Sequence, residues 1–205
     1  MGGCLKIDIH NHAFTYESAS GPEEVIEAAI ASGLDGIAFT EHNSYTASGM
    51  AEELKREYSG RITIFRGAEY DAAEGHLILF GITDNGFMDL GMFAPASEVL
   101  RYLEPRGAVA IIAHPFRGAG RFKTDLSLVK GITAVEAYNG HNTPGENEMA
   151  LRAAASLGLP TTGGSDSHGK EDVGRCYTEF LDMVTEEGLV AALKSGRYRG
   201  VCVRP

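Results

Sequence analysis

Histidines and carboxylates recur along this chain in short motifs whose spacing suits a metal site. Residues 8–12 read Asp-Ile-His-Asn-His, and histidines two residues apart point the same way in an extended chain. Asp166 and His168 repeat this spacing further along. Imidazole and carboxylate ligands without cysteine suit Zn, Mn or Fe, with little selectivity among them. The two motifs therefore indicate chemistry that depends on a divalent metal.

Most of the seven histidines follow directly after a predicted strand. Those that do are His10, His12, His42, His114 and His168. The carboxyl ends of parallel strands form the edge at which α/β proteins carry their active sites. His76 opens a strand instead, and His141 lies further into a loop. A single histidine is more often a packed or surface residue. Paired motifs at several strand ends favour ligands, because buried charged groups are unfavourable unless they are paired or bind metal.

Short apolar runs alternate with helix-like stretches along the chain. The predicted strands are residues 4–9, 36–40, 61–66, 76–81, 108–113, 132–137, 160–163, 178–181 and 200–204. The predicted helices are residues 22–32, 47–58, 98–104, 146–157 and 185–194. This alternation implies parallel strands with helical crossovers, which leaves an α/β barrel or a doubly wound sheet. Residues 83–95 are weakly patterned, and either a lid over the substrate or an ordinary surface loop would explain them.

The composition is typical of one globular domain, which we expect to span residues 1–205, with 43% hydrophobic and 22% charged residues. No apolar run approaches the roughly 20 residues of a membrane span. The three scattered cysteines form no disulfide framework, so we expect a cytoplasmic protein. The formal net charge of −10 argues against binding to the phosphate backbone of nucleic acids. A small phosphorylated substrate is compatible with this charge, because bound metals add local positive charge.

In their order along the chain, five motifs resemble those of the PHP family, named for the polymerase and histidinol phosphatase proteins that share it. They are D-x-H-x-H through His12, T-E-H through His42, G-x-E through Glu69, A-H-P around His114 and G-S-D-x-H through His168. Each motif is short, but five in this order at strand ends are specific. The resemblance implies an α/β fold of PHP type, a distorted TIM-like barrel of about seven β/α units, with a site for up to three metals.

The resemblance also implies which residues bind the first two metals. The ligands of the first metal would be His10, His12, Glu69 and Asp166. Glu69 would bridge to a second metal, whose binding His76 and His114 would complete. Paired metals of this kind stand roughly 3.5–4 Å apart in enzymes that cleave phosphate esters, and a bridging carboxylate would set this separation.

For a third metal, the resemblance implies His42 and His168 as ligands, with Glu17 as the remaining one. Two departures from the family pattern concern this site. The family usually reads Asp-Gly near the position of Glu17, and it usually reads T-D-H where this chain has Glu41 before His42. We expect Glu41 to orient His42 or a neighbour rather than to bind metal, and Asp8 to hydrogen-bond a ligating histidine.

The expected chemistry is hydrolysis of a phosphate ester, whose negative charge repels a nucleophile. Paired metals counter this repulsion, and they lower the pKa of their bound water toward ~7, so that metal-bound hydroxide is available. The predicted catalytic residues are Glu69, Asp166 and His168. His168 or His42 could protonate the leaving group. Arg117 and Arg175 are predicted phosphate contacts, because the guanidinium fork matches phosphate oxygens.

The predicted function is therefore hydrolysis of small phosphomonoesters or phosphodiesters with two to three divalent metals. Arg117 would alternatively be a solvent-exposed arginine of its loop, Glu136 is expected beside the ligands rather than among them, and His141 on the surface. An exonuclease-like phosphodiesterase is disfavoured by the acidic charge. A non-catalytic metal-binding module is disfavoured by the complete ligand set. An amidohydrolase acting on C–N bonds usually needs a lysine bridge, where this chain has Glu69.

Overall fold

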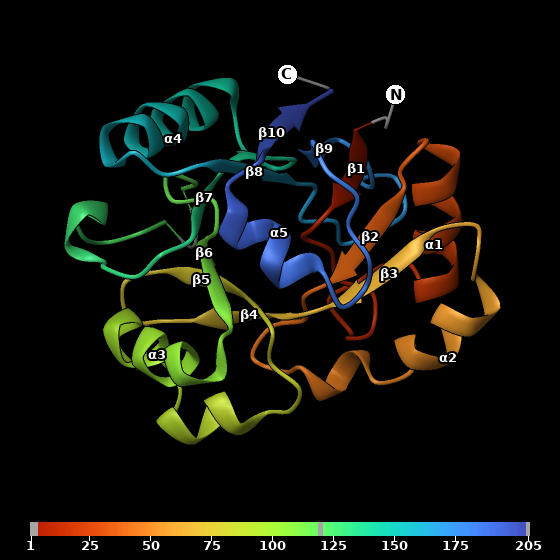
Figure 1. Cartoon of the computed structure of the whole chain (residues 1–205), viewed down its shortest axis with the longest axis horizontal. Helices are drawn as coiled ribbons and strands as arrows, with labels where there is room; N and C mark the ends of the chain where they lie inside the picture. Colours follow the sequence, from red (N-terminus) through yellow and green to blue (C-terminus); the bar gives the residue numbers. More distant parts are fainter. Residues whose placement is uncertain (1–3, 119–120, 204–205) are drawn as a thin grey trace.

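The computed structural model describes residues 4–118 and 121–203, whose strands form two five-stranded sheets (Figure 1). The first has the order β10-β9-β1-β2-β3, with bounds Tyr198–Cys202, Cys176–Phe180, Leu5–Asp8, Gly36–Phe39 and Thr63–Arg66. The second has the order β4-β5-β6-β7-β8, with bounds Ala68–Asp71, His76–Phe80, Val109–Ile112, Ala134–Asn139 and Thr161–Gly164. The α/β class expected from the sequence is confirmed.

Helices cover the outer faces of both sheets, as Figure 1 shows for α1 and α2 beside β2 and β3, and for α4 beside β7. The α-helices α1 to α5 span Pro22–Ala31, Ala51–Glu57, Ala96–Leu103, Pro144–Leu157 and Leu189–Ser195. The 3-10 helices η1 to η4 span Thr46–Ser48, Gly86–Leu90, Glu104–Arg106 and Leu126–Leu128. No helix in these described ranges is both long and apolar enough to cross a membrane.

Local sequence explains where α4 begins and ends. The Thr143 hydroxyl accepts a hydrogen bond from the backbone N–H of Glu146, whose carboxylate accepts from the N–H of Thr143 in return. This reciprocal cap satisfies N–H groups that the first helical turn leaves without partners. Gly158 ends the helix in the left-handed conformation, at a φ of 65°.

The prediction of uniformly parallel strands is wrong for two parts of the fold. β4, β5 and β6 pair antiparallel, as do β1, β9 and β10, whereas β1-β2-β3 and β6-β7-β8 are parallel. Residues 72–75 alone connect β4 to β5, and so short a link forms a hairpin, because a parallel crossover needs a dozen or more residues. β4 itself was not predicted. Of the last predicted strand, Arg204 lies outside the described residues.

The two sheets meet at two isolated bridges beside the predicted site. His42, beyond β2, pairs with Glu69 of β4, and Asn11, beyond β1, pairs with Ser167, beyond β8. These bridges bring the carboxyl ends of β1, β2 and β8 next to β4. Closure into a barrel of β/α units stays a prediction.

Apolar side chains fill the space between the sheets and the space beneath the helices. The inner cluster combines residues of both sheets, such as Ile7, Ile78 and Ile111, with Leu189 and Leu193 of α5. Helix α5 lies across the middle of the molecule in Figure 1. Separate clusters lie under α1 and α2, under α3 and under α4. The inner cluster therefore supports the polar residues that follow the strand ends.

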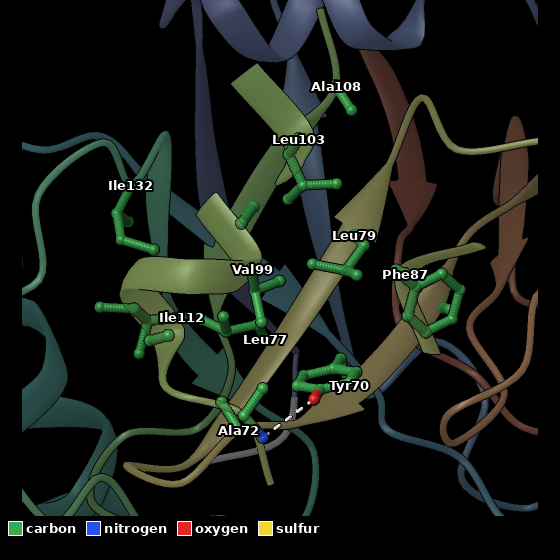
Figure 2. Close-up of a cluster of buried hydrophobic side chains, with 14 of the residues drawn as sticks. Tyr70, Ala72, Leu77, Leu79, Phe87, Val99, Leu103, Ala108, Ile112 and Ile132 are labelled. Atoms are coloured by element: carbon green, nitrogen blue, oxygen red, sulfur yellow. Dashed lines mark hydrogen bonds between the residues drawn. The ribbon is translucent and has the colours of Figure 1, made fainter. Parts of the chain in front are cut away.

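Residues 83–95, for which the sequence left a lid or a surface loop open, pack into the apolar cluster beneath α3. Figure 2 shows Phe87 of η2 beside Tyr70, and their ring centroids lie 5.9 Å apart. Phe87 is fully buried, and the backbone N–H of Ala94 donates to the Tyr70 hydroxyl over 3.0 Å. Residues 83–95 are thus anchored on the apolar cluster beneath α3 through Phe87 and Ala94.

Candidate metal centre

Seven of the other eight predicted metal ligands converge around Glu69, which is buried in β4. Four predicted ligands form one group: His10, His12, Glu69 and Asp166, all buried. The Nε2 atoms of His10 and His12 lie 3.1 and 3.3 Å from Glu69 Oε2, and 3.4 and 3.3 Å from Asp166 Oδ1. Ligand atoms about 2.1 Å from one tetrahedral metal are separated by about 3.4 Å, so these atoms fit a single ion.

A second group lies on the other oxygen of Glu69. Glu69 Oε1 is 2.8 Å from His76 Nδ1 and 2.9 Å from His114 Nε2. His76 opens β5 and His114 follows β6, so both rings come from the second sheet. The two carboxylate oxygens of Glu69 therefore face two separate sets of histidines, as the predicted bridging role requires.

A third group consists of His12, His42 and His168. The His12 ring stacks on both others, with centroids 4.8 Å from His42 and 4.6 Å from His168. Glu17 is exposed and lines a surface pocket together with His42. Among the described residues, Glu17 belongs to none of the ligand groups.

Asp71 joins a further group with His42 and His76, and the sequence reasoning missed it. Asp71 follows Glu69 by two residues on β4, so both side chains lie on the same face of the strand. The same spacing identified the two paired motifs, and it could have identified Asp71 had β4 been predicted.

Three further buried carboxylates hold the backbone and rings of the cluster. Glu136 accepts from His10 Nδ1 over 2.9 Å and from the backbone N–H of His114 over 3.0 Å. Asp8 accepts from the backbone N–H of Ser165 over 2.9 Å and, as expected, from a histidine of the cluster, through the backbone N–H of His10 over 3.4 Å. Glu41 accepts from the backbone N–H groups of residues 13 and 14, over 2.8 and 3.2 Å, and so fixes the loop after the first motif rather than His42.

The predicted phosphate contacts lie at different distances from the cluster. Arg117 Nη1 forms an ion pair with Asp166, and Arg117 Nη2 lies 3.2 Å from His114 Nε2. Arg175 instead forms an ion pair with Asp172 over 2.6 Å. His141 is exposed as expected, but its ring centroid lies 6.2 Å from that of His168.

The backbone is strained where two ligands leave their strands. His114 has a φ of 27° and Asp166 a φ of 54°, in the left-handed region that residues other than glycine rarely adopt. Such strain persists only where surrounding contacts impose it, and it is common at functional sites. Beside them, Gly164 ends β8 in a tight space: a Cβ there would lie 2.5 Å from His10 Cβ and 2.7 Å from Glu136 Oε1.

Charges within the cluster compensate one another. Burial alone would lower the pKa of His10, but Asp166, Glu136 and Glu69 raise it well above its usual range. Burial also opposes charge on His12, yet Asp166 and Glu69 raise its pKa to about 9. The histidines in turn hold the pKa of Glu69 well below its usual range, against the effect of burial.

Several buried atoms of the cluster lack a hydrogen bond. They include His12 Nε2 and Asp166 Oδ1. Buried polar atoms without partners are unfavourable, and a coordinated cation would satisfy those that point into the cluster. The donor set and these unsatisfied atoms therefore fit divalent metal ions held by nitrogen and oxygen.

Comparison with known proteins agrees with this geometry. The family model of the PHP domain matches residues 8–112, and the PHP-associated model matches residues 144–198. The protein MJ1587 of Methanocaldococcus jannaschii, itself uncharacterised, is 24% identical over 136 residues, which cover 66% of this chain and 76% of that protein.

Two solved structures share the fold. One is PsfC from Pseudomonas syringae, with a TM-score of 0.74 and 22% identity, covering 98% of this chain and 93% of that one. The other is a two-domain protein of Bacteroides vulgatus that contains a predicted PHP-like metal-dependent phosphoesterase. It has a TM-score of 0.78 and 20% identity, and the match covers 97% of this chain and 65% of that one.

Proposed function

The chain belongs to the PHP domain family, and from this premise we propose that it is a metal-dependent hydrolase of small phosphate esters. One observation carries the proposal: the two oxygens of Glu69 face two separate histidine sets, at 3.1 Å from His10 Nε2 and 2.9 Å from His114 Nε2. A carboxylate placed in this way can bridge two cations. Paired divalent metals, when bound, supply positive charge for phosphoryl oxygens and a water of lowered pKa.

We propose two to three divalent ions, Zn, Mn or Fe, as the cofactors. The first would be held by His10, His12, Glu69 and Asp166. The second would be held by Glu69, His76 and His114. A third would be held by His42 and His168, which lie next to His12. The exposed position of Glu17 gives no support for its role as a ligand of the third ion.

His168 is better suited to bind metal than to donate a proton. Its Nδ1 donates to the backbone oxygen of Asp166 over 3.0 Å, which leaves the lone pair of Nε2 for a cation. Burial and the nearby charge of His12 lower the pKa of His168, so the ring is neutral near pH 7. A neutral ring with a free lone pair is a ligand rather than an acid.

Arg117 is proposed to bind the phosphate. Its guanidinium lies against Asp166 and His114 at the edge of the ligand cluster, and its side chain is 22% exposed. A guanidinium group at this position can donate hydrogen bonds to the non-bridging oxygens of a phosphate ester bound at the metals. Arg175 is directed at Asp172, which gives a phosphate-binding role less support.

The other parts of the proposal rest on sequence or topology. The two bridges between the sheets, His42 with Glu69 and Asn11 with Ser167, support closure into a distorted barrel. A single domain over residues 1–205, small phosphorylated substrates and a cytoplasmic location are proposed from the sequence.

The direct test combines metal analysis with an assay of two model esters. The purified protein, loaded with Zn²⁺ or Mn²⁺, is expected to hold two to three metals and to hydrolyse p-nitrophenyl phosphate or its bis ester. His10→Ala should lose metal and turnover, whereas Asp182→Ala, which removes an exposed carboxylate paired with Arg197, should keep both. A chain that takes up no metal under any loading condition would refute the proposal.

A further inference from the structure

Asp71 lies between two histidines that belong to different ligand groups. Its Oδ1 is 3.3 Å from His42 Nδ1 and 3.5 Å from His76 Nε2. We propose that Asp71 is a positioning residue, whose Oδ1 accepts the outward N–H of both rings and thereby turns their other nitrogens toward the metals. This inference rests on the proposed function.

The orientations of the His42 and His76 rings support this role. His42 directs Nε2 toward Glu69 Oε2, at 3.4 Å, and His76 directs Nδ1 toward Glu69 Oε1, at 2.8 Å. The two rings thus present opposite nitrogens to Glu69, and each presents its remaining nitrogen to Asp71. A neutral imidazole that binds metal through one nitrogen carries its proton on the other, so both rings would have an N–H to donate to Asp71.

The carboxylate is itself held in place by Asn43. Asp71 Oδ2 accepts from Asn43 Nδ2 over 2.8 Å, and the backbone N–H of Asp71 donates to Asn43 Oδ1 over 3.0 Å. Asn43 has a positive φ of 52°, and its own N–H donates to the backbone oxygen of Glu69 over 2.7 Å. The two oxygens of Asp71 thus have separate neighbours: Oδ2 contacts Asn43, and Oδ1 faces the two rings.

A comparable arrangement exists on the opposite side of the cluster. Glu136 accepts from His10 Nδ1 over 2.9 Å, while His10 Nε2 faces Glu69 and Asp166. Ligating histidines commonly donate their second N–H to such a carboxylate, which fixes the tautomer and the ring orientation. Asp71 differs in serving two rings at once, one from each of two groups. We infer that it couples the second metal to the third.

The test measures metal affinity in Asp71→Ala and Asp71→Asn. Zn²⁺ and Co²⁺ are titrated against a chromophoric chelator, and the visible absorption of Co²⁺ reports the geometry of each site. Asp71→Ala should weaken binding at the sites of His42 and His76 about 10- to 100-fold, as loss of such partners does, and leave the site of His10 unchanged. Asp71→Asn should recover part of the loss, because its amide oxygen still accepts a hydrogen bond.

The controls separate this inference from the proposed function. Asp182→Ala removes a carboxylate remote from the cluster and should match the wild type, and thermal unfolding in chelator verifies that each variant is folded. Equal metal affinities in Asp71→Ala and the wild type would overturn the inference while metal binding itself persists. Complete loss of one metal in both variants, without recovery in Asp71→Asn, would make Asp71 a ligand and also overturn it.

A second inference is independent of the metals and concerns two cysteines. Cys176 of β9 and Cys202 of β10 are opposite one another in the antiparallel register, and their Sγ atoms lie 3.0 Å apart. Opposed residues in such strands have Cα atoms about 4.5–5.5 Å apart, within the range that a disulfide requires. We propose that this pair is a site of reversible oxidation, which forms an intramolecular disulfide when a peroxide is present.

In this step each thiol loses its proton and one electron, the S–S bond forms, and the O–O bond of hydrogen peroxide breaks to give two water molecules. Cys202 is half-buried and would meet the oxidant first, whereas burial raises the pKa of the Cys176 thiol.

The test counts thiols before and after treatment with hydrogen peroxide, with mass spectrometry under non-reducing conditions. Peroxide should remove two of the three thiols of the wild type and both thiols of Cys4→Ser, and a reductant should restore them. In Cys202→Ser no intramolecular disulfide should form. Retention of all three thiols, or a disulfide that joins two chains through Cys4, would overturn the proposal.

Discussion

The two faces of strand β4 belong to different kinds of interior. Glu69 and Asp71 point toward the histidine cluster, whereas Ala68 and Tyr70 belong to the apolar cluster beneath α3 (Figure 2). The first interior consists of charges that compensate one another and of atoms that a cation would satisfy. The second consists of apolar surface removed from water. Strand β4 thus separates a polar cluster from an apolar one. Substitutions on its polar face should affect metal binding, and substitutions on its apolar face should affect stability.

Glu69→Gln should give the largest effect, because it removes the charge shared by two ligand groups while keeping the size of the side chain. We expect turnover on a phosphate ester to fall by more than about 100-fold, since even partners of metal ligands matter to that extent. Metal content should fall by at least one ion per chain, as elemental analysis would measure. A variant with wild-type metal content would contradict the bridging role.

Phe87→Ala tests the apolar face. Loss of a fully buried aromatic ring should lower the free energy of unfolding by about 3–5 kcal/mol, as measured by urea denaturation. Metal content per folded chain should not change, because Phe87 packs on Tyr70 and touches no ligand group. If Phe87→Ala lost metal while folded, the two faces of β4 would not be independent.

A change of pH should affect the polar face through the protons that a metal must displace. In the chain without metal, the pKa of His12 is about 9, raised by the neighbouring carboxylates against the effect of burial. Below that pH the ring is protonated, so apparent metal affinity should rise with pH and level off above pH 9. We expect about a tenfold rise per pH unit for each proton displaced. Chelator competition from pH 6 to 8 measures it, and a flat profile would contradict it.

Tyr70→Phe should give the smallest effect. It removes only the hydroxyl, which donates to the backbone oxygen of Gly91 and accepts from the N–H of Ala94. We expect a loss of about 1–3 kcal/mol in unfolding free energy, typical of two internal hydrogen bonds. Urea denaturation in parallel with Phe87→Ala would show whether the ring or its hydroxyl anchors residues 83–95.

The sequence predicted the members of the histidine and carboxylate cluster that follow parallel strands. His10, His12, His42 and His114 could be placed because strand ends share one edge, a rule that needs only the order of the elements. The distances agree with the ligand groups that the family resemblance implied, apart from Glu17. Glu17 lies in a loop, and neither periodicity nor motif order determines where a loop side chain points.

The antiparallel hairpin could not be predicted in the same way. Residues 67–75 are rich in Gly and acidic side chains, which are uncommon in strands, so no strand was expected at β4. Its pairing with β5 depends on contacts that local sequence does not encode. As a result, Asp71 had no predicted neighbours, although the register places it opposite His76.

The tight space at Gly164 has a consequence for any experiment that scores every substitution at every position. A side chain there would collide with His10 and with Glu136, so even alanine should damage the cluster. In such a scan Gly164 would resemble a catalytic residue, although it offers no atom to a metal or a substrate. In this protein, the positions that tolerate no substitution will therefore include residues that leave space for the histidine cluster as well as residues that take part in the reaction.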